Sequence, residues 1–293
     1  MTHRSGVVAV VGRPNVGKST LVNALVGEKV AIVSDKPQTT RRGIRGIRTE
    51  DGFQVVFVDT PGFHKPRTLL GRRLNDAVRE ATAGVDAVVL VVDGAAGVGR
   101  GDAFVYAHEV AVVDAPRLCA VNKIDRLGGG RELPQLAAAA DLGPFDEIVP
   151  VSARSGAGLD VLLRLLVERL PEGPVLYPGG EATDQPLEDR LAEIVREQAL
   201  ARTREEVPHS IAVVVDEVER EGDLTRIVAR IVVERDSQKG IIIGTRGAML
   251  KEIGTAARGG LESLLGTRVY LDLHVTVLPG WQRDPKGLQR LGF

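Results

Sequence analysis

At 293 residues, with 43% hydrophobic and 26% charged side chains, the chain has the composition of a globular protein with one large or two ordinary domains. The formal net charge of −1 excludes a general attraction to nucleic acid, so any RNA-binding site has to be a local patch. The longest apolar runs, such as Ala87–Val92, are too short to span a bilayer, and the amino terminus lacks the layout of a signal peptide. The single cysteine, Cys119, cannot form an internal disulfide, so we expect a cytoplasmic protein.

A loop bracketed by glycines follows the first predicted strand. Val7–Val11 is an apolar run typical of a buried strand, and Leu21–Val26 has helical spacing and ends at Gly27. Between them lies the pattern G-x-x-x-x-G-K-[ST], in which backbone N–H groups and a helix N-terminus hold phosphate groups. The flanking strand and helix argue against a chance glycine turn. The predicted nucleotide-binding residues here are Gly12, Arg13, Pro14, Asn15, Val16, Gly17, Lys18, Ser19 and Thr20.

Strands and helices alternate up to about Leu170, which predicts an α/β fold with a mostly parallel sheet and helices on both faces. A turn at Glu50-Asp51-Gly52 joins two runs into a hairpin and adds one antiparallel edge strand. The predicted strands after the first are Ile44–Thr49, Phe53–Val58, Ala87–Val92, Arg117–Val121 and Glu147–Val151, and the predicted helices are Gly101–Val113, Glu132–Ala140 and Leu159–Leu170.

Polar residues follow three of these strands, at the sheet edge where ligands bind in such folds. The first group is Asp59, Thr60, Pro61 and Gly62. Asp59 is expected to hold Mg²⁺ through water, together with the Ser19 hydroxyl, while Lys18 reaches the β- and γ-phosphates. The Gly62 N–H is placed to meet the γ-phosphate.

The other two groups point to a purine base. They are Asn122, Lys123 and Asp125, followed after the next strand by Ser152 and Ala153. The Asp125 carboxylate can accept from both N1–H and the 2-amino group of guanine, which adenine lacks, so the wrong base would be rejected by roughly 10⁴-fold or more. The Ala153 N–H can donate to the guanine O6. Each group alone could be an ordinary polar turn, but together and in this order they predict a guanine-nucleotide site.

With these motifs, residues 5–172 resemble the translation-factor-type GTPases. Such enzymes need a threonine to complete the Mg²⁺ shell and sense the γ-phosphate, and the family pattern favours Thr40, with Thr39 as the alternative. Lys18, Thr40 and Gly62 are therefore the expected catalytic residues. Such a segment orders with GTP and loosens after hydrolysis.

One position departs from Ras-like enzymes, where a glutamine that orients the attacking water follows Asp-x-x-Gly. Here Phe63 follows, and it can neither orient nor deprotonate water. His64 comes next and is more often a structural residue than a catalytic one in such a place. GTPases with an asparagine where Asn15 lies often recruit K⁺, which neutralises charge between the phosphates. We therefore expect slow hydrolysis stimulated by K⁺, with Asn15 acting through the ion.

The pattern changes after a short segment rich in proline and glycine, residues 177–186, which we expect to link a GTPase domain (1–176) to a second domain (187–293). The expected order is helix, strand, strand, G-x-x-G turn, helix, strand and a carboxyl-terminal helix. The segments are Leu187–Arg204, Ser210–Val218, Arg226–Arg235, Gly244–Gly247, Ala248–Ile253 continued by Gly259–Leu265, and Arg268–Leu278. This order is that of a type II KH domain, which binds single-stranded RNA.

The RNA site is expected around the G-x-x-G turn, where backbone N–H groups approach the RNA backbone and an apolar run forms the floor of a groove for bases. The expected residues are Lys239, Ile241, Ile242, Ile243, Gly244, Thr245, Arg246 and Gly247. Lys and Arg outnumber Asp and Glu over residues 226–293, and the reverse holds over residues 184–225. A plain helix turn is the alternative, because G-x-x-G alone is a weak pattern.

The whole chain resembles the Era family of bacterial ribosome-assembly GTPases, which belongs to the wider TrmE/Era group. The resemblance rests on Gln38-Thr39-Thr40-Arg41, Asp59–Gly62, Gln238–Gly244 and Trp281–Asp284 with Leu288–Phe293. It implies GTP and GDP as substrate and product, Mg²⁺, the 3′ end of 16S rRNA and the small (30S) ribosomal subunit as partners, a monomer, and peripheral association with the inner membrane face. Family members often carry a lysine and a glycine inside the turn, whereas this chain has Thr245-Arg246.

Two other functions compete with a GTPase switch in 30S assembly. One is an RNA chaperone, gated by guanine nucleotide, with negligible turnover, which Phe63 favours. The other is a tRNA-modification GTPase, which shares Asn15 and the threonine pair but needs a catalytic domain for which this chain leaves no room.

Overall fold

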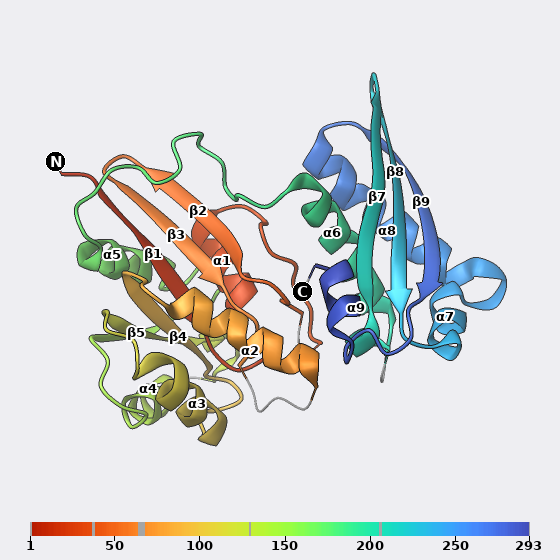
Figure 1. The fold of residues 1–293 in the computed structure, drawn as a ribbon. Helices are drawn as coiled ribbons and strands as arrows, with labels where there is room; N and C mark the ends of the chain where they lie inside the picture. Colours follow the sequence, from red (N-terminus) through yellow and green to blue (C-terminus); the bar gives the residue numbers. More distant parts are fainter. Residues whose placement is uncertain (1, 37–38, 64–67, 129, 205–206, 293) are drawn as a thin grey trace. The chain divides into compact units, whose positions relative to one another are not determined.

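The computed structural model describes residues 2–36, 39–63, 68–128, 130–204 and 207–292 (Figure 1). The chain divides into two compact units, the first holding most residues up to Asp184 and the second all those from Gln185 on. The elements of the first unit are β1 (Arg4–Val11), α1 (Lys18–Val26), β2 (Ile44–Glu50), β3 (Phe53–Asp59), α2 (Leu69–Thr82), β4 (Ala87–Asp93), α3 (Arg100–Val105), the π-helix η1 (Tyr106–Val110), β5 (Arg117–Asn122), the 3₁₀ turn η2 (Ile124–Arg126), α4 (Glu132–Ala140), β6 (Glu147–Pro150) and α5 (Leu159–Arg169).

The first unit is built on a six-stranded sheet with the order β2-β3-β1-β4-β5-β6. All strand pairs are parallel except β2 with β3, so β2 is the antiparallel edge strand that the hairpin predicts. One buried cluster joins the sheet to α1 and α5, and another joins it to α2, α3, η1 and α4. Helices thus cover both faces (Figure 1), which explains why the inner strands are continuous apolar runs.

Two helical features of this unit differ from the prediction. Helix α2 was not expected, although Leu70, Leu74 and Val78 recur every four residues and are fully buried. This apolar stripe is hard to recognise in the sequence, since many of the other positions in the helix are charged or polar. The helix expected over Gly101–Val113 is instead the short α3 followed by the π-helix η1, which ends at Val110.

The second unit has one three-stranded sheet with helices on one face. Its elements are α6 (Leu187–Arg202), the 3₁₀ turn η3 (Pro208–Ser210), β7 (Ala212–Glu221), β8 (Leu224–Val233), α7 (Asp236–Ile243), the 3₁₀ turn η4 (Thr245–Gly247), α8 (Ala248–Leu265), β9 (Arg268–Val277) and α9 (Pro285–Arg290). The strand order is β7-β8-β9, with β7 antiparallel and β9 parallel to β8. The core of this unit lies between the sheet and α6, α7 and α8.

The segment expected to link the two domains is hydrogen-bonded to the sheet of the first unit. The Gln54 side-chain carbonyl accepts from Leu176 N (2.8 Å) and Tyr177 N (2.9 Å), and Ile47 N donates to Ala182 O (2.7 Å). The Tyr177 hydroxyl donates to Asp184 (2.9 Å). These bonds hold residues 176–184 along β2 and β3, which is why the first unit reaches Asp184.

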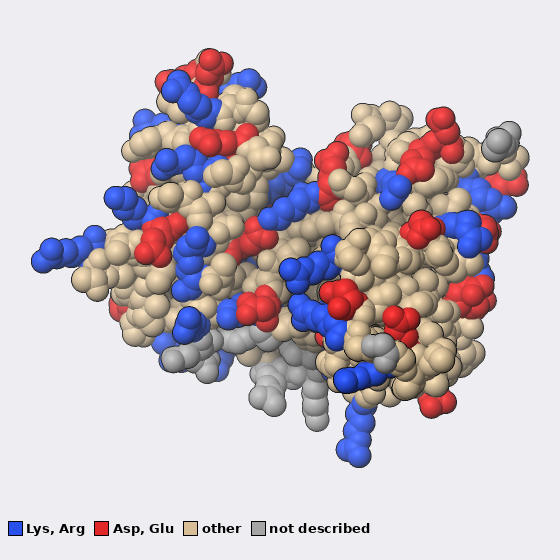
Figure 2. Space-filling view, turned by 180° about the vertical axis from the view of Figure 1, so that it is seen from behind, with Lys and Arg blue, Asp and Glu red and all other residues tan. Residues whose placement is uncertain are grey.

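Figure 2 shows positive and negative side chains intermixed over the visible face, as the net charge of −1 suggests. Of the helices that the structure describes, none has the length and apolar character needed to cross a membrane.

Candidate functional site

The glycine-bracketed loop leads from β1 into α1, whose first residue is Lys18. The Lys18 side chain is buried, and its Nζ donates to the main-chain oxygens of Gly12 and Arg13, both at 3.0 Å. Burial lowers the pKa of Lys18 to about 8, while the nearby Asp59 carboxylate acts in the opposite direction. A polyanion bound here would favour the charged form, because an opposite charge within a few ångströms stabilises it.

The three residues expected to surround Mg²⁺ come together from three different segments. The Ser19 hydroxyl donates to Asp59 Oδ2 (2.7 Å), and Thr40 Oγ1 lies 2.9 Å from Ser19 Oγ and 3.0 Å from Asp59 Oδ2. Burial raises the pKa of Asp59, against the effects of Lys18 and the two hydroxyls. The other oxygen, Asp59 Oδ1, is buried and has no hydrogen-bond partner among the described residues. Two hydroxyls and a carboxylate with an unpaired oxygen are donors that suit a hard cation such as Mg²⁺.

The residues after Asp59 fold closely against the phosphate-binding loop. Thr60 Oγ1 donates to Val10 O (2.8 Å), and Phe63 N donates to Gly12 O (3.2 Å). A side chain at Gly62 would place its Cβ 2.7 Å from the backbone of Pro14, so this close approach requires glycine. Pro61, between Thr60 and Gly62 in the sequence, is also buried.

Phe63, which follows Gly62, is packed among other side chains. Its side chain is 3% exposed and stacks on Phe104 of α3, with ring centroids 5.6 Å apart, and the Arg79 guanidinium lies 6.0 Å from its centroid. His64, weighed as a catalytic residue, and Gln38 of the family pattern lie outside the described residues.

The base-recognition residues also meet. Buried Asn122 donates from Nδ2 to Val16 O (2.9 Å), and the Ser152 hydroxyl donates to Asp125 Oδ1 (2.6 Å), which orients that exposed carboxylate. The Ala153 N–H was expected to bond the guanine O6. In the structure it donates to Asn122 Oδ1 (3.0 Å), so a bond to O6 would have to share or replace this one.

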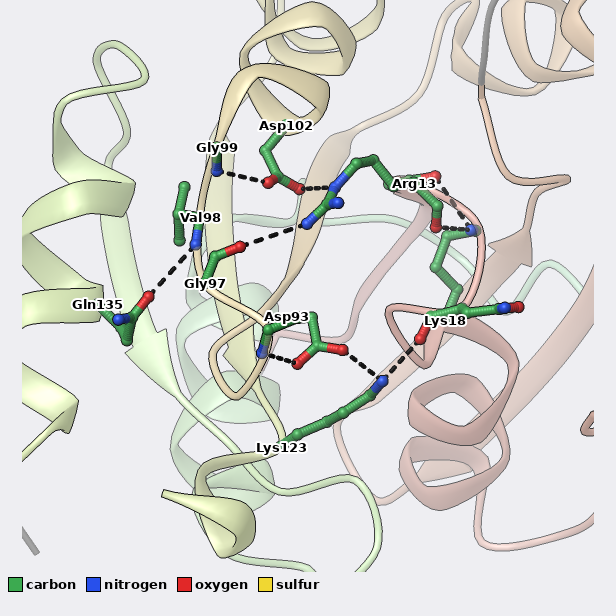
Figure 3. Close-up of polar contacts among 12 residues, drawn as sticks. Arg13, Lys18, Asp93, Gly97, Val98, Gly99, Asp102, Lys123 and Gln135 are labelled. Atoms are coloured by element: carbon green, nitrogen blue, oxygen red, sulfur yellow. Dashed lines mark hydrogen bonds and ion pairs between the residues drawn. The ribbon is translucent and has the colours of Figure 1, made fainter. Parts of the chain in front are cut away.

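Lys123 shows a contact that the sequence analysis missed. Its Nζ donates to Asn15 O (2.7 Å) and to Asp93 Oδ2 (2.5 Å), which ties the loop before α1 to the ends of β4 and β5 (Figure 3). Asp93 directly follows a predicted strand, so the rule that identified Asp59 and Asn122 could have found it. Asn15 itself is exposed and has a left-handed backbone, with φ of 65°.

The turn expected to bind RNA lies between α7 and α8 in the second unit. Thr245 and Arg246 are exposed, Gly244 and Gly247 are half-buried, and Arg246 has a left-handed backbone with φ of 53°. Ile241 is 49% exposed, whereas Ile242 is fully buried in the core against the sheet. The expectation that Ile242 lines an apolar groove is therefore wrong, while the RNA-binding role of the other residues stays a prediction. In a helix only one side of a three-residue run faces outward, so the Ile242 side chain has no exposed surface on which a base could pack. Lys239 and Ile243 are half-buried and keep some exposed surface.

Comparisons with known proteins agree with both units. A family model described as a 50S ribosome-binding GTPase matches residues 7–123, and a KH-domain model matches residues 206–282. The crystal structure of Era in complex with MgGDPNP and nucleotides 1506–1542 of 16S ribosomal RNA has a TM-score of 0.96 and 40% identity, and covers 99% of both chains. A variant of Aquifex aeolicus Era bound to GDP.AlF4⁻ has a TM-score of 0.95 at the same identity and coverage. These matches confirm the predicted fold class, a P-loop GTPase domain followed by a KH domain.

Curated relatives extend over the full length. GTPase Era of Mycolicibacterium smegmatis is 55% identical over 295 residues, which cover 99% of each chain. GTPase Era of Mycobacterium tuberculosis is 54% identical over 295 residues, covering 99% of this chain and 98% of the relative. On this likeness, the chain belongs to the Era family of GTPases.

Proposed function

We propose that this GTPase binds the 3′ end of 16S rRNA and acts in the assembly of the small ribosomal subunit, with the bound nucleotide setting its affinity for RNA. The full-length similarity to Era crystallised with MgGDPNP and 16S rRNA nucleotides carries the proposal. It is supported by a guanine-nucleotide site in the first unit and an exposed, basic G-x-x-G turn in the second. Since ribosomal subunits assemble in the cytoplasm, we expect the protein to act there, as a monomer. Peripheral association with the membrane stays a prediction.

In the nucleotide site, the positions of the residues suggest which of them would contact the phosphates, the Mg²⁺ ion and the base. Lys18, held by two carbonyls, would contact the β- and γ-phosphates, and the Gly62 N–H the γ-phosphate. Ser19, Thr40 and Asp59 would hold Mg²⁺, which when bound neutralises charge on the phosphates. Because Thr40 lies in the segment between α1 and β2, loss of the γ-phosphate would release that segment. Asp125 and Asn122 would recognise the base.

We further propose that K⁺ stimulates hydrolysis through Asn15. Phe63 is buried and offers no polar group that could orient water, so help for the reaction has to come from elsewhere. A K⁺ ion held near Asn15 would supply it by neutralising charge between the phosphates. Turnover should be several-fold faster in K⁺ than in Na⁺ at equal ionic strength, and Asn15→Asp should abolish that difference. Equal rates in the two salts, or an unchanged K⁺ response in the variant, would contradict the proposal.

The RNA partner is tested by crosslinking in cells. Protein held in its GTP state by a non-hydrolysable analogue should yield reads concentrated at the 3′ end of 16S rRNA, while Arg246→Gln should lose them and keep nucleotide binding. Reads from other RNAs alone would overturn the partner and leave the GTPase unaffected. If phosphate release stayed negligible even with small subunits present, the gated RNA chaperone would describe the protein better.

A further inference from the structure

The carboxyl group of Asp102 on α3 is fully buried. A buried carboxylate is unfavourable unless it is paired and hydrogen-bonded. Here it accepts from Arg13 Nε (2.7 Å) and from Gly99 N (2.9 Å), as Figure 3 shows. The pair joins the phosphate-binding loop to a helix nearly ninety positions later in the sequence.

The side chain of Arg13 passes close to Gly101 on its way to Asp102. A Cβ at Gly101 would collide with Arg13 Cδ, so a side chain there would force the arginine stem to shift from its present path to Asp102. The Arg13 guanidinium also donates to Gly97 O (3.4 Å), which fixes its second end to the connection between β4 and α3. Arg13 is thus held at two places by one segment of the chain.

The main-chain oxygen of Arg13 in turn accepts a hydrogen bond from Lys18. Arg13 O accepts from Lys18 Nζ at 3.0 Å, alongside Gly12 O. A rigid acceptor at this place directs the buried ammonium, and a charge fixed before the reaction stabilises a transition state more than one that has to reorganise. The same helix also supplies Phe104, which stacks on Phe63 next to Gly62. Helix α3 therefore contacts both loops expected to surround the γ-phosphate.

We propose that Asp102 is a positioning residue for GTP hydrolysis, which acts through Arg13 to fix the main-chain carbonyl that directs Lys18. Neither Asp102 nor the Arg13 side chain has to touch the nucleotide for this. Without the ion pair, the main chain around Arg13 would be free to move, although the glycines of the loop and Lys18 themselves are unchanged. The chemical step should then suffer more than binding, because misdirection of a catalytic charge lowers kcat.

The test compares four full-length variants, Asp102→Asn, Arg13→Ala, the double variant and Glu147→Gln. The last is a matched control, since Glu147 forms an ion pair of the same length (2.7 Å) with Arg169, between β6 and α5. Single-turnover GTP hydrolysis, KM for GTP, GDP release and urea unfolding are measured for each. Hydrogen bonds to charged groups are strong enough for a loss of about tenfold in kcat in Asp102→Asn, with KM within about threefold of the parent.

The double variant separates positioning from general destabilisation. If Asp102 acts through Arg13, the double variant should lose no more kcat than the worse single variant, because the two changes remove one interaction. It also leaves no buried unpaired charge, so it remains informative if Asp102→Asn folds poorly. The proposal is overturned if folded Asp102→Asn and the double variant both keep kcat within twofold of the parent, if the losses of the single variants multiply, or if Glu147→Gln loses as much.

Discussion

Asp125 shows how a single side chain can decide which base a site accepts. The Ser152 hydroxyl holds its carboxylate at 2.6 Å, so the two oxygens have a fixed direction before any base arrives. Asp125→Asn replaces an acceptor by an amide that can donate to the 2-carbonyl of xanthine and can no longer accept two bonds from guanine. We predict a loss of GDP affinity of roughly 10²-fold or more and a gain for XDP. Competition with a fluorescent nucleotide measures both, with Asp141→Asn on the exposed surface as control. A variant that kept its guanine preference would refute the role of Asp125.

Glu109 on η1 is a residue whose burial should be visible in the pH dependence of stability. Its side chain is 1% exposed, Oε1 has no hydrogen-bond partner within the described part of the chain, and the guanidinium of Arg79 is 3.8 Å away. Burial raises the pKa of Glu109 from 4.5 to about 7, although Arg79 and His108 act to lower it. Between these two values the folded protein binds more protons than the unfolded chain, so this group makes stability fall as the pH rises.

Glu109→Gln should therefore raise the free energy of unfolding at pH 8 by about 1–3 kcal/mol and change it little near pH 4.5. Urea unfolding across this range measures the difference between variant and parent, which removes the contributions of other titrating groups. Glu132→Gln, at the exposed start of α4, is the control and should follow the parent at every pH. A constant offset between Glu109→Gln and the parent would show that Glu109 does not titrate in this range.

At the level of residues, the sequence located the nucleotide site because its motifs are continuous in the chain. Ser19, Thr40 and Asp59 could be predicted together since each has a recognisable neighbourhood. The residues that contact the phosphate-binding loop from elsewhere in the chain could not be predicted. Asp102 reaches Arg13 across a sequence separation of 89 residues, and no spacing rule links them. Ile242 was misjudged for a related reason, because a triple isoleucine does not reveal which of its members faces the core.

At the level of elements, the turn between α7 and α8 is the part whose role in RNA binding can be measured alone. Arg246 is exposed at its tip, so Arg246→Gln removes a charge without disturbing the core. We predict weaker binding of single-stranded RNA and a shallower salt dependence, by about 0.7 in the slope of log K against log salt for one lost phosphate contact. Arg258→Gln, exposed on α8 itself, should leave the slope nearer to the parent value. Identical slopes in all three proteins would remove Arg246 from the RNA interface.

Strands could be predicted more accurately than helices, for a physical reason. β4 is buried along its whole length, so its apolar run is unmistakable. Helix α2 has only a narrow buried apolar stripe among many charged and polar residues, and it was not predicted. The π-helix η1 could not be foreseen either, since its residues have helical spacing and only the hydrogen bonds distinguish it from α3. The docked segment at 176–184 depends on Gln54, whose amide carries no pattern of its own.

At the level of the whole molecule, the chain joins two units that each have a complete core. The first holds the residues of a GTPase, and the second presents a basic turn next to a sheet covered by helices. If the bound nucleotide governs RNA binding, the γ-phosphate has to favour the state of the protein that binds RNA more tightly. Because such coupling is reciprocal, RNA must then raise the affinity for GTP relative to GDP by the same factor. Thr40, which lies against Ser19 and Asp59, is the residue through which this dependence should act.

The most direct test of this coupling is the Kd of the protein for an RNA with the sequence of the 16S 3′ end, measured with Mg²⁺ and either GDPNP or GDP. We predict binding at least about fivefold to tenfold tighter with GDPNP, a difference that Thr40→Ala should abolish while GDP affinity stays close to that of the parent. Equal Kd values in the two nucleotide states of the parent protein would contradict the account, because the GTPase and the RNA-binding unit would then act independently.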